Sequence, residues 1–282
     1  MRLFERVENL LLAAIDGMYA LLPQPHPGVE RLRGCQIISH RGEHDNRRVF
    51  ENTLAAFDAA VAQGVWGIEF DLRWTRDLEP VVVHDPDLRR VFGRNLRVGD
   101  VALPCLRKEG PQVPTLAEVV GRYGGKVHLM MEIKAEPYPD RDRRNRLLGD
   151  LFAALKPGRD FHLLSLDPEM FRPIDFAPPA AFVPVARLNF ARLSRLSLQK
   201  GYGGVAGHYA LVGDRAIRRL HAAGQKVGTG YPRARNCLFR ETRRGVDWIF
   251  CNHAGEALRL IRRLQAPAGT SGGRPFCGSS TK

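Results

Sequence analysis

Paired cysteines, long apolar runs and internal repeats are all scarce in this chain of 282 residues. The five cysteines are odd in number, widely spaced and without a CxxC pair, which favours reduced thiols in a cytoplasmic protein over a disulfide framework. The apolar run at residues 10–15 ends at Asp16, so it is too short for a signal peptide or a membrane span. No segment recurs at a fixed period, which excludes solenoids and propellers.

Acidic side chains are also in short supply. There are 30 of them against 43 Lys and Arg, giving a formal net charge of +13, and a basic protein attracts nucleic acid, anionic lipid or phosphorylated substrates. The arginines are spread over many segments, such as 141–146, 215–219 and 243–244, and are not interleaved with aromatic residues in any of them. We therefore expect no nucleic-acid partner, and we interpret the arginines as solvated helix faces rather than a polyanion site.

An amphipathic helix is predicted at the start of the chain. Apolar side chains recur at steps of three and four through residues 3–22, and prolines at 23, 25 and 27 stop the pattern. The helix either packs on the rest of the domain or plugs its bottom, or it lies on a lipid surface as a peripheral membrane contact. Acidic residues on the helix weaken the second interpretation. We assign residues 1–34 to this helix and a linker.

Apolar runs then alternate with helical patterns. The runs cover residues 36–39, 67–72, 127–133, 161–166, 181–185, 204–208, 226–230 and 248–251. Helical patterns between them include 52–63, 115–123, 144–155, 214–223 and 256–264. Such alternation predicts a parallel sheet, and eight strands would close an α/β fold of the (β/α)8 TIM-barrel type over residues 35–265. The small and polar residues 266–282 predict a disordered tail.

A ninth apolar run at residues 80–84 does not fit this count. It follows Asp71 by only nine residues, too few for a crossover helix between parallel strands. We therefore expect residues 72–83 to form a hairpin extension after strand 2.

Ionisable side chains follow or end several of these runs, where a (β/α) barrel places its chemistry. They are His40 and Arg41, Glu69 and Asp71, His84, and Glu132 and Lys134. Three carboxylates at one mouth would repel one another without a cation, and oxygen ligands suit a hard divalent ion, Mg²⁺ or Ca²⁺. Two histidines can supply a general acid and a general base, while an arginine and a lysine can hold a phosphate. The set predicts metal-assisted cleavage of a phosphodiester.

Longer motifs surround these residues. They are His40-Arg41-Gly42, Glu51-Asn52-Thr53, Glu69-x-Asp71, Pro80-Val81-x-Val83-His84-Asp85, Leu88-x-Arg90, Pro114-Thr115-Leu116 and Glu132-Ile133-Lys134. With them, residues 36–264 resemble the glycerophosphodiester phosphodiesterase family. That family has a (β/α) barrel and cleaves glycerophosphodiesters to an alcohol and glycerol 3-phosphate.

The resemblance implies a role for each matching residue. It implies metal ligands at Glu69, Asp71 and Glu132, an acid–base pair at His40 and His84, phosphate contacts at Arg41 and Lys134, and a metal-proximal acid at Glu51. The residues alone leave a second interpretation of Glu51 open, as an acid in the first turn of the following helix, although the resemblance favours the site.

The chain also departs from the family pattern. Residues 42–50 form a longer loop without the usual proline before Glu51. Gly228-Thr229-Gly230-Tyr231 stands where the family usually has Trp-Thr, and Asn252-His253 replaces the usual acid after the last strand. We therefore expect a different wall near the leaving group.

The expected function is metal-dependent hydrolysis of a small-molecule glycerophosphodiester by two-histidine acid–base catalysis. One alternative is a lysophospholipase D that acts on lysophospholipids at a membrane, helped by the N-terminal helix and the basic charge. Another is a non-catalytic barrel that binds phosphorylated ligands, although none of the matching catalytic positions is lost.

Overall fold

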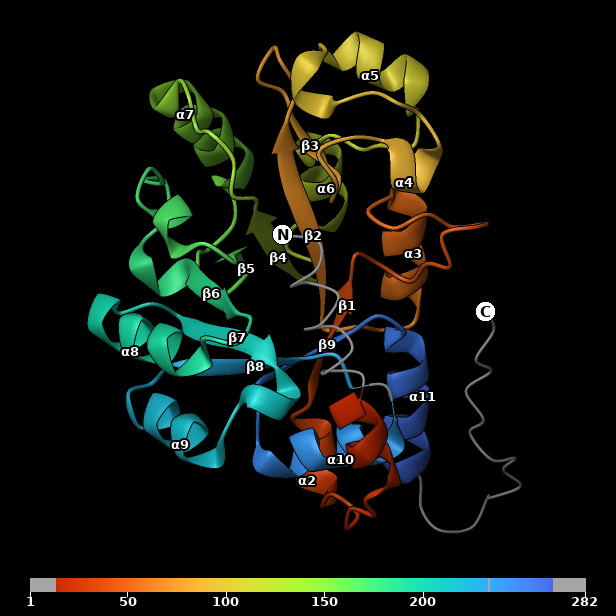
Figure 1. The fold of residues 1–282 in the computed structure, drawn as a ribbon, viewed down its shortest axis with the longest axis vertical. Coiled ribbons are helices and arrows are strands. Elements are labelled where there is room, and N and C mark those ends of the chain that lie inside the picture. Colours follow the sequence, from red (N-terminus) through yellow and green to blue (C-terminus); the bar gives the residue numbers. More distant parts are fainter. Residues whose placement is uncertain (1–13, 233, 266–282) are drawn as a thin grey trace.

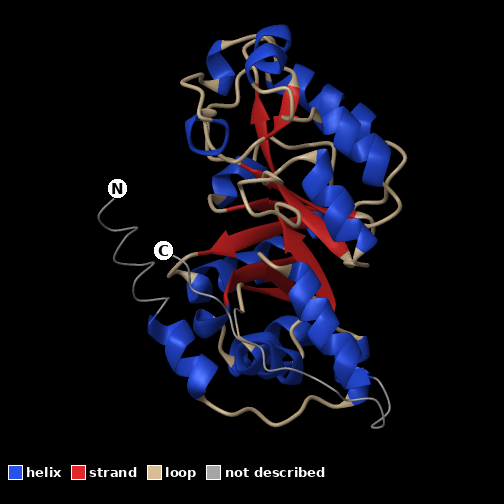
Figure 2. Ribbon diagram, turned by 90° about the vertical axis from the view of Figure 1, so that its right-hand side faces the viewer, coloured by secondary structure: helices blue, strands red, loops and turns tan. Residues whose placement is uncertain are grey.

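Eight parallel strands form a closed ring in the computed structural model, which describes residues 14–232 and 234–265. The strands are β1 Gln36–His40, β2 Gly67–Trp74, β4 His128–Ile133, β5 Phe161–Ser165, β6 Phe182–Ala186, β7 Gly204–His208, β8 Lys226–Gly230 and β9 Trp248–Cys251. β1 pairs in parallel with both β2 and β9, which closes the ring. Helices surround these strands (Figures 1 and 2), so the predicted (β/α)8 barrel is confirmed.

The helices lie mainly between consecutive strands. They are α2 Val29–Arg33, α3 Leu54–Ala62, α4 Arg89–Phe92, α5 Leu103–Glu109, α6 Leu116–Tyr123, α7 Arg141–Phe152, α8 Phe190–Lys200, α9 Asp214–Ala222, α10 Arg235–Arg244 and α11 Ala254–Gln265. Local sequence fixes several starts. Thr53 caps α3, and Thr115 forms a capping box with Glu118 at the start of α6, because each threonine oxygen accepts a free amide of the first turn.

The hairpin after strand 2 is also confirmed. β3 (Pro80–Val82) pairs antiparallel with the end of β2, with Val82 opposite Leu72. The amide of Val83 then donates to the carbonyl oxygen of Asp71 at 3.0 Å. This bond brings the following residue, His84, to the end of β2.

The barrel interior is filled with side chains. Its central cluster is Ile38, Met130, Leu164, Val183, Ala206, Trp248 and Phe250. At the amino-terminal ends of the strands, His128 Nε2 lies 2.7 Å from His162 Nδ1, and both imidazoles are buried. Burial lowers the pKa of His128 to about 4, and burial with the neighbouring imidazole lowers that of His162 to about 2. The filled interior is no channel, and barrels of this type carry their chemistry at the carboxyl ends of the strands.

The described part of the predicted N-terminal helix, residues 14–21, packs outside the ring rather than at its bottom. The buried carboxylate of Asp16 accepts a hydrogen bond from the Tyr209 hydroxyl at 2.5 Å, and Asn236 of α10 donates to the Ala20 carbonyl oxygen. The rest of that predicted helix and the predicted tail at 266–282 lie outside the described residues. Within the described ranges, no helix combines the length and apolar character needed to cross a membrane.

Candidate active site

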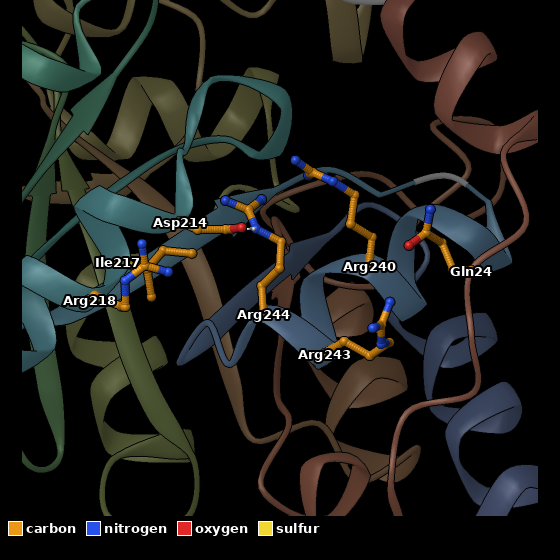
Figure 3. A pocket seen from close by; sticks show the side chains of 7 residues that line it. All are labelled: Gln24, Asp214, Ile217, Arg218, Arg240, Arg243 and Arg244. Carbon is orange, nitrogen blue, oxygen red and sulfur yellow. Dashed lines mark hydrogen bonds and ion pairs between the residues drawn. The ribbon is translucent and has the colours of Figure 1, made fainter.

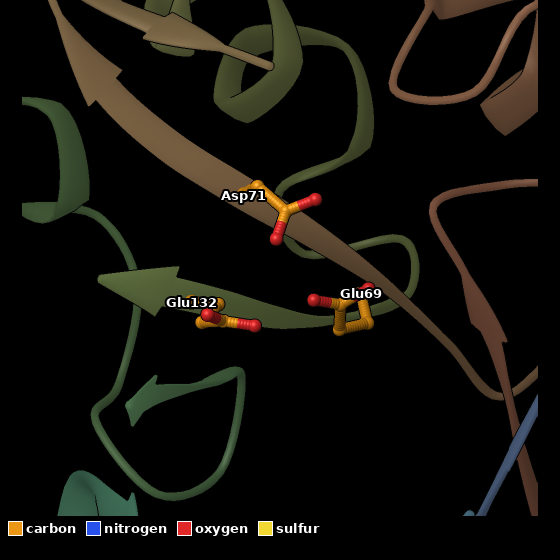
Figure 4. A group of neighbouring side chains, drawn as sticks. All are labelled: Glu69, Asp71 and Glu132. Carbon is orange, nitrogen blue, oxygen red and sulfur yellow. The ribbon is translucent and has the colours of Figure 1, made fainter. Parts of the chain in front are cut away.

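Three carboxylates meet at the mouth of the barrel. Glu69 and Asp71 stand two residues apart on β2, and Glu132 of β4 lies opposite Asp71 in the sheet register. Because side chains alternate along a strand, all three point to the same side. Each offers an oxygen within 4.8 Å of the others, and Figure 4 shows them converging from the two strands. The side chains of Glu69 and Asp71 are buried, and that of Glu132 is 12% exposed.

Two cations lie against these acids. Lys134 Nζ is 2.5 Å from Asp71 Oδ1 and 2.6 Å from Glu132 Oε1, and Arg41 Nε is 3.2 Å from Asp71 Oδ2. Burial would raise the pKa of Asp71, but the lysine and the arginine hold it well below its usual range. Burial would lower the pKa of Lys134, but the two carboxylates keep it raised.

The carboxylates still outnumber the cations by one. The pKa of Glu69 is accordingly raised, first by burial and then by the charges of Asp71 and Glu132. Crowded oxygen donors of this kind suit a hard divalent cation. Adding two positive charges would leave the cluster net positive and therefore able to attract a phosphodiester anion. The donor set thus fits a metal ion.

His40, at the end of β1, is held from its far side. Its Nδ1 lies 2.7 Å from Asn252 Oδ1, just after β9, and its Nε2 lies 3.7 Å from Glu69 Oε2. The ring of Tyr231 packs over it with centroids 4.6 Å apart. Burial, together with the charge of Arg41, lowers the pKa of His40 to about 3. The ring is therefore neutral near pH 7, with Nε2 turned toward the carboxylates.

His84 has a carboxylate partner instead. Its Nδ1 lies 2.7 Å from Asp85 Oδ1, and Arg90 Nε lies 2.5 Å from Asp85 Oδ2. Burial would raise the pKa of Asp85, but its bonds to His84 and Arg90 keep it below its usual value. Arg73 Nε donates to the His84 carbonyl oxygen at 2.8 Å, so both the backbone and the ring of His84 are fixed.

Glu51 lies with arginines rather than with the carboxylate cluster. Arg41 Nη1 and Arg90 Nη2 approach its Oε1 at 3.1 and 2.6 Å, and Asn46 Nδ2 donates to its Oε2 at 2.7 Å. Burial would raise the pKa of Glu51, but these partners lower it to about 2. Because Thr53 caps α3, Glu51 precedes the helix, so it is not a first-turn acid. It ties Arg41 to Arg90.

Several further residues complete the site, and their types alone do not predict a role there. Asn52, with a left-handed φ of 58°, donates from Nδ2 to Asp71 Oδ2 at 2.7 Å. Its signal was its place in the Glu51-Asn52-Thr53 motif. Asp85 and Arg90 also lie in motifs that resemble those of the family. Asn252 and Tyr231 stand where the chain departs from the family pattern, and that departure was their only signal.

The unusual loop before Glu51 is an ordered turn. The carboxylate of Asp45 accepts the backbone amides of Arg47, Arg48 and Val49 at 2.8–3.1 Å. Asn46 follows with a φ of 53° and bonds Glu51 from both its side-chain oxygen and nitrogen. The extra residues therefore form a support for Glu51 that needs no proline.

The fold and this site together define a phosphodiesterase-type (β/α)8 barrel with a candidate metal centre. Residues 40–160 match the model of the glycerophosphoryl diester phosphodiesterase family. The protein YhdW of Bacillus subtilis, which carries the name of a glycerophosphodiester phosphodiesterase, is 33% identical over 173 residues, covering 56% of this chain and 69% of YhdW. The chain belongs to the glycerophosphodiester phosphodiesterase family.

Other proteins share the sequence pattern or the fold. A glycerophosphodiester phosphodiesterase of Caldanaerobacter subterraneus is 37% identical over 111 residues, covering 35% of this chain and 45% of the relative. The glycerophosphodiester phosphodiesterase structure from Thermotoga maritima has the same fold, with a TM-score of 0.66 at 20% identity, covering 80% of this chain and 98% of that one. An Oleispira antarctica phosphodiesterase, solved with its product sn-glycerol-3-phosphate, gives 0.62 at 21% identity, covering 80% and 96%.

Proposed function

We propose that the chain hydrolyses glycerophosphodiesters to an alcohol and glycerol 3-phosphate, using Mg²⁺ or Ca²⁺ held by Glu69, Asp71 and Glu132. The observation that carries the proposal is the gathering of these carboxylates with two histidines and two cations at one barrel mouth. When bound, the metal ion would offset the negative charge that develops on the phosphate oxygens. The product bound by the Oleispira antarctica phosphodiesterase supports the substrate class.

Arg41 and Lys134 are the proposed phosphate contacts. Arg41 is held from two sides, by Asp71 and by Glu51, so its guanidinium is fixed before substrate arrives. A fixed guanidinium can donate to two phosphate oxygens at once, whereas the lysine ammonium adds a point charge. Both contacts orient the phosphorus atom for attack.

The partners of the two histidines suggest their roles. The oxygen of Asn252 accepts from His40 Nδ1–H, which leaves the Nε2 lone pair of His40 free to take a proton, as a general base requires. The carboxylate of Asp85 accepts from Nδ1 of His84 and fixes the ring, which leaves Nε2 as the atom that would hand a proton to the leaving oxygen in the role of general acid. Burial would raise the pKa of Asp71, and Lys134, Arg41 and then His84 lower it, which places His84 near the same carboxylate.

The proposed reaction follows from these roles. His40 takes the proton of the attacking hydroxyl, whose oxygen bonds to phosphorus while the bond from phosphorus to the leaving oxygen breaks. His84 delivers its proton to that leaving oxygen, which departs as the alcohol. The attacking hydroxyl is either water or the neighbouring glycerol hydroxyl of the substrate. In the second case a cyclic phosphate forms and water opens it by the reverse proton transfers.

The test is the hydrolysis of glycerophosphocholine by purified variants. His40→Ala and His84→Ala should each lower kcat by about 10²–10⁴-fold with the melting temperature little changed. His221→Ala is the matched control, because His221 lies on α9 and bonds Asp247 outside the mouth. A chelator should abolish wild-type turnover, and Mg²⁺ or Ca²⁺ should restore it. Near wild-type rates from either site variant would exclude the acid–base assignment.

A lysophospholipase D activity is the second candidate. A rat lysophospholipase D is 44% identical over 64 residues, covering 23% of this chain and 20% of that protein. Lysophosphatidylcholine assayed beside glycerophosphocholine distinguishes the two. Faster turnover of the acylated substrate would favour this candidate, and it would leave the roles of the histidines unchanged.

A further inference from the structure

A second polar pocket lies outside the barrel mouth, between α9, α10 and the segment that follows the N-terminal helix. Its volume is about 420 Å³, and it is lined by Gln24, Asp214, Ile217, Arg218, Arg240, Arg243 and Arg244. Figure 3 shows the arginines of α10 facing this space, with Gln24 at one end and Arg218 of α9 at the other. None of these residues belongs to the proposed active site.

Positive charge exceeds negative charge in this pocket. Arg244 pairs with Asp214 and with the buried Glu241, and Arg240 also pairs with Glu241. Arg218 and Arg243 are exposed, and neither has a hydrogen bond or ion pair with any residue that the structure describes. Two guanidinium groups are therefore available to an anion from solvent, and guanidinium matches the geometry of phosphate.

Exposed apolar side chains adjoin the pocket. Met18, Leu21 and Leu22 are 52%, 83% and 45% exposed. Leu22 is two residues from the pocket-lining Gln24. The same segment is fastened to α10, since the guanidinium of Arg240 stacks on the Tyr19 ring at 4.5 Å and Asn236 bonds the Ala20 carbonyl oxygen. The segment that carries these apolar side chains is thus fixed against α10, the helix that carries Arg243.

We propose that the surface formed by the pocket and residues 18–22 docks on a bilayer that contains anionic phospholipid. Arg218 and Arg243 would bind lipid phosphates, while Leu21, Leu22 and Met18 enter the boundary between headgroups and acyl chains. Charge complementarity selects this partner, because unpaired cations beside exposed apolar groups match an anionic headgroup above a hydrocarbon layer. The inference is independent of the proposed hydrolysis, because it uses no residue of the catalytic mouth.

Co-sedimentation of the full chain with vesicles tests the proposal. Wild type should bind vesicles of phosphatidylcholine with roughly one-third phosphatidylglycerol, and should bind phosphatidylcholine alone much more weakly. Arg218→Gln with Arg243→Gln should weaken binding to the anionic vesicles about tenfold or more, because each arginine near an anionic membrane surface contributes to the binding free energy. Leu21→Ser with Leu22→Ser should weaken it as well. Hydrolysis of soluble glycerophosphocholine should be unchanged in both double variants.

The matched control is Arg146→Gln with Arg192→Gln. It removes the same charge from exposed positions on α7 and α8, and vesicle binding should stay at or near the wild-type level. The proposal is overturned if wild type does not sediment with anionic vesicles. Binding of inorganic phosphate without sedimentation would have the same consequence. Equal loss of binding in the control and pocket variants would also overturn it, because net charge alone would then explain attachment.

Discussion

Asn252→Ala is the substitution that most directly tests how the general base is held. The Asn252 amide lies 2.7 Å from His40 Nδ1, and the imidazole is largely buried, its side chain 13% exposed. Without the acceptor, the Nδ1–H is left unsatisfied in a desolvated position, at a cost of about 1–3 kcal/mol. The ring can lower that cost only by turning or by changing tautomer, and either change removes the Nε2 lone pair from the substrate.

If this cost falls on the transition state, kcat should drop about tenfold to a hundredfold, since about 1.4 kcal/mol corresponds to a factor of ten. KM should change little, because Asn252 is not a phosphate contact. Steady-state hydrolysis of glycerophosphocholine at saturating metal ion gives both values. Asn252→Asp keeps an acceptor at the same place and should recover much of the lost kcat.

Asn236→Ala provides the control, because that amide bonds the Ala20 carbonyl oxygen outside the mouth and its loss should leave kcat intact. The reasoning fails if Asn252→Ala retains wild-type kcat with an unchanged melting temperature. It also fails if Asn252→Ala and Asn252→Asp lose the same activity, since a retained acceptor would then have no value.

Two further predictions concern other buried groups. The folded-state pKa values of His128 and His162 lie below the unfolded value of about 6.5, so their contribution to stability is complete above about pH 6.5 and is lost as the pH falls toward 4. The free energy of unfolding, measured in urea, should fall by about 2 kcal/mol per imidazole between about pH 7.5 and about pH 5. The double variant His128→Gln with His162→Gln should show a flatter pH dependence. Lys134→Met should lower kcat/KM at least about tenfold yet tighten Mg²⁺ binding in calorimetry, because Asp71 and Glu132 lose a competing cation; weaker Mg²⁺ binding would contradict the assigned ligands.

Much of the architecture could be predicted from local pattern. The alternation of apolar runs with helical periods anticipated the eight-stranded ring, and the nine-residue gap after Asp71 anticipated β3. The position of Glu69 and Asp71 on one face followed from the two-residue period of a strand, which needs no tertiary information. The helices α4 and α5, between residues 85 and 114, are too short to leave a periodic signal.

What could not be predicted depends on contacts between distant segments. Asn252 reaches His40 across 212 positions, and an asparagine carries no catalytic signal by itself. Arg144, expected on a solvated face with its neighbours, is instead buried, with its guanidinium 4.6 Å from the Trp74 ring centroid and 4.8 Å from that of Tyr138. Whether an arginine is solvated or stacked depends on aromatic rings supplied by other segments.

The proposed site residues are distributed unevenly along the chain. Every group proposed to touch phosphate, metal or a transferred proton lies between His40 and Lys134. Among the described residues, the segments after β8 and β9 supply Tyr231 and Asn252, which contact His40. The interior beside them is full, since a Cβ at Gly228 would lie 2.9 Å from the Phe250 ring. The second half can therefore vary without replacing any group proposed to touch the phosphate, the metal ion or a transferred proton.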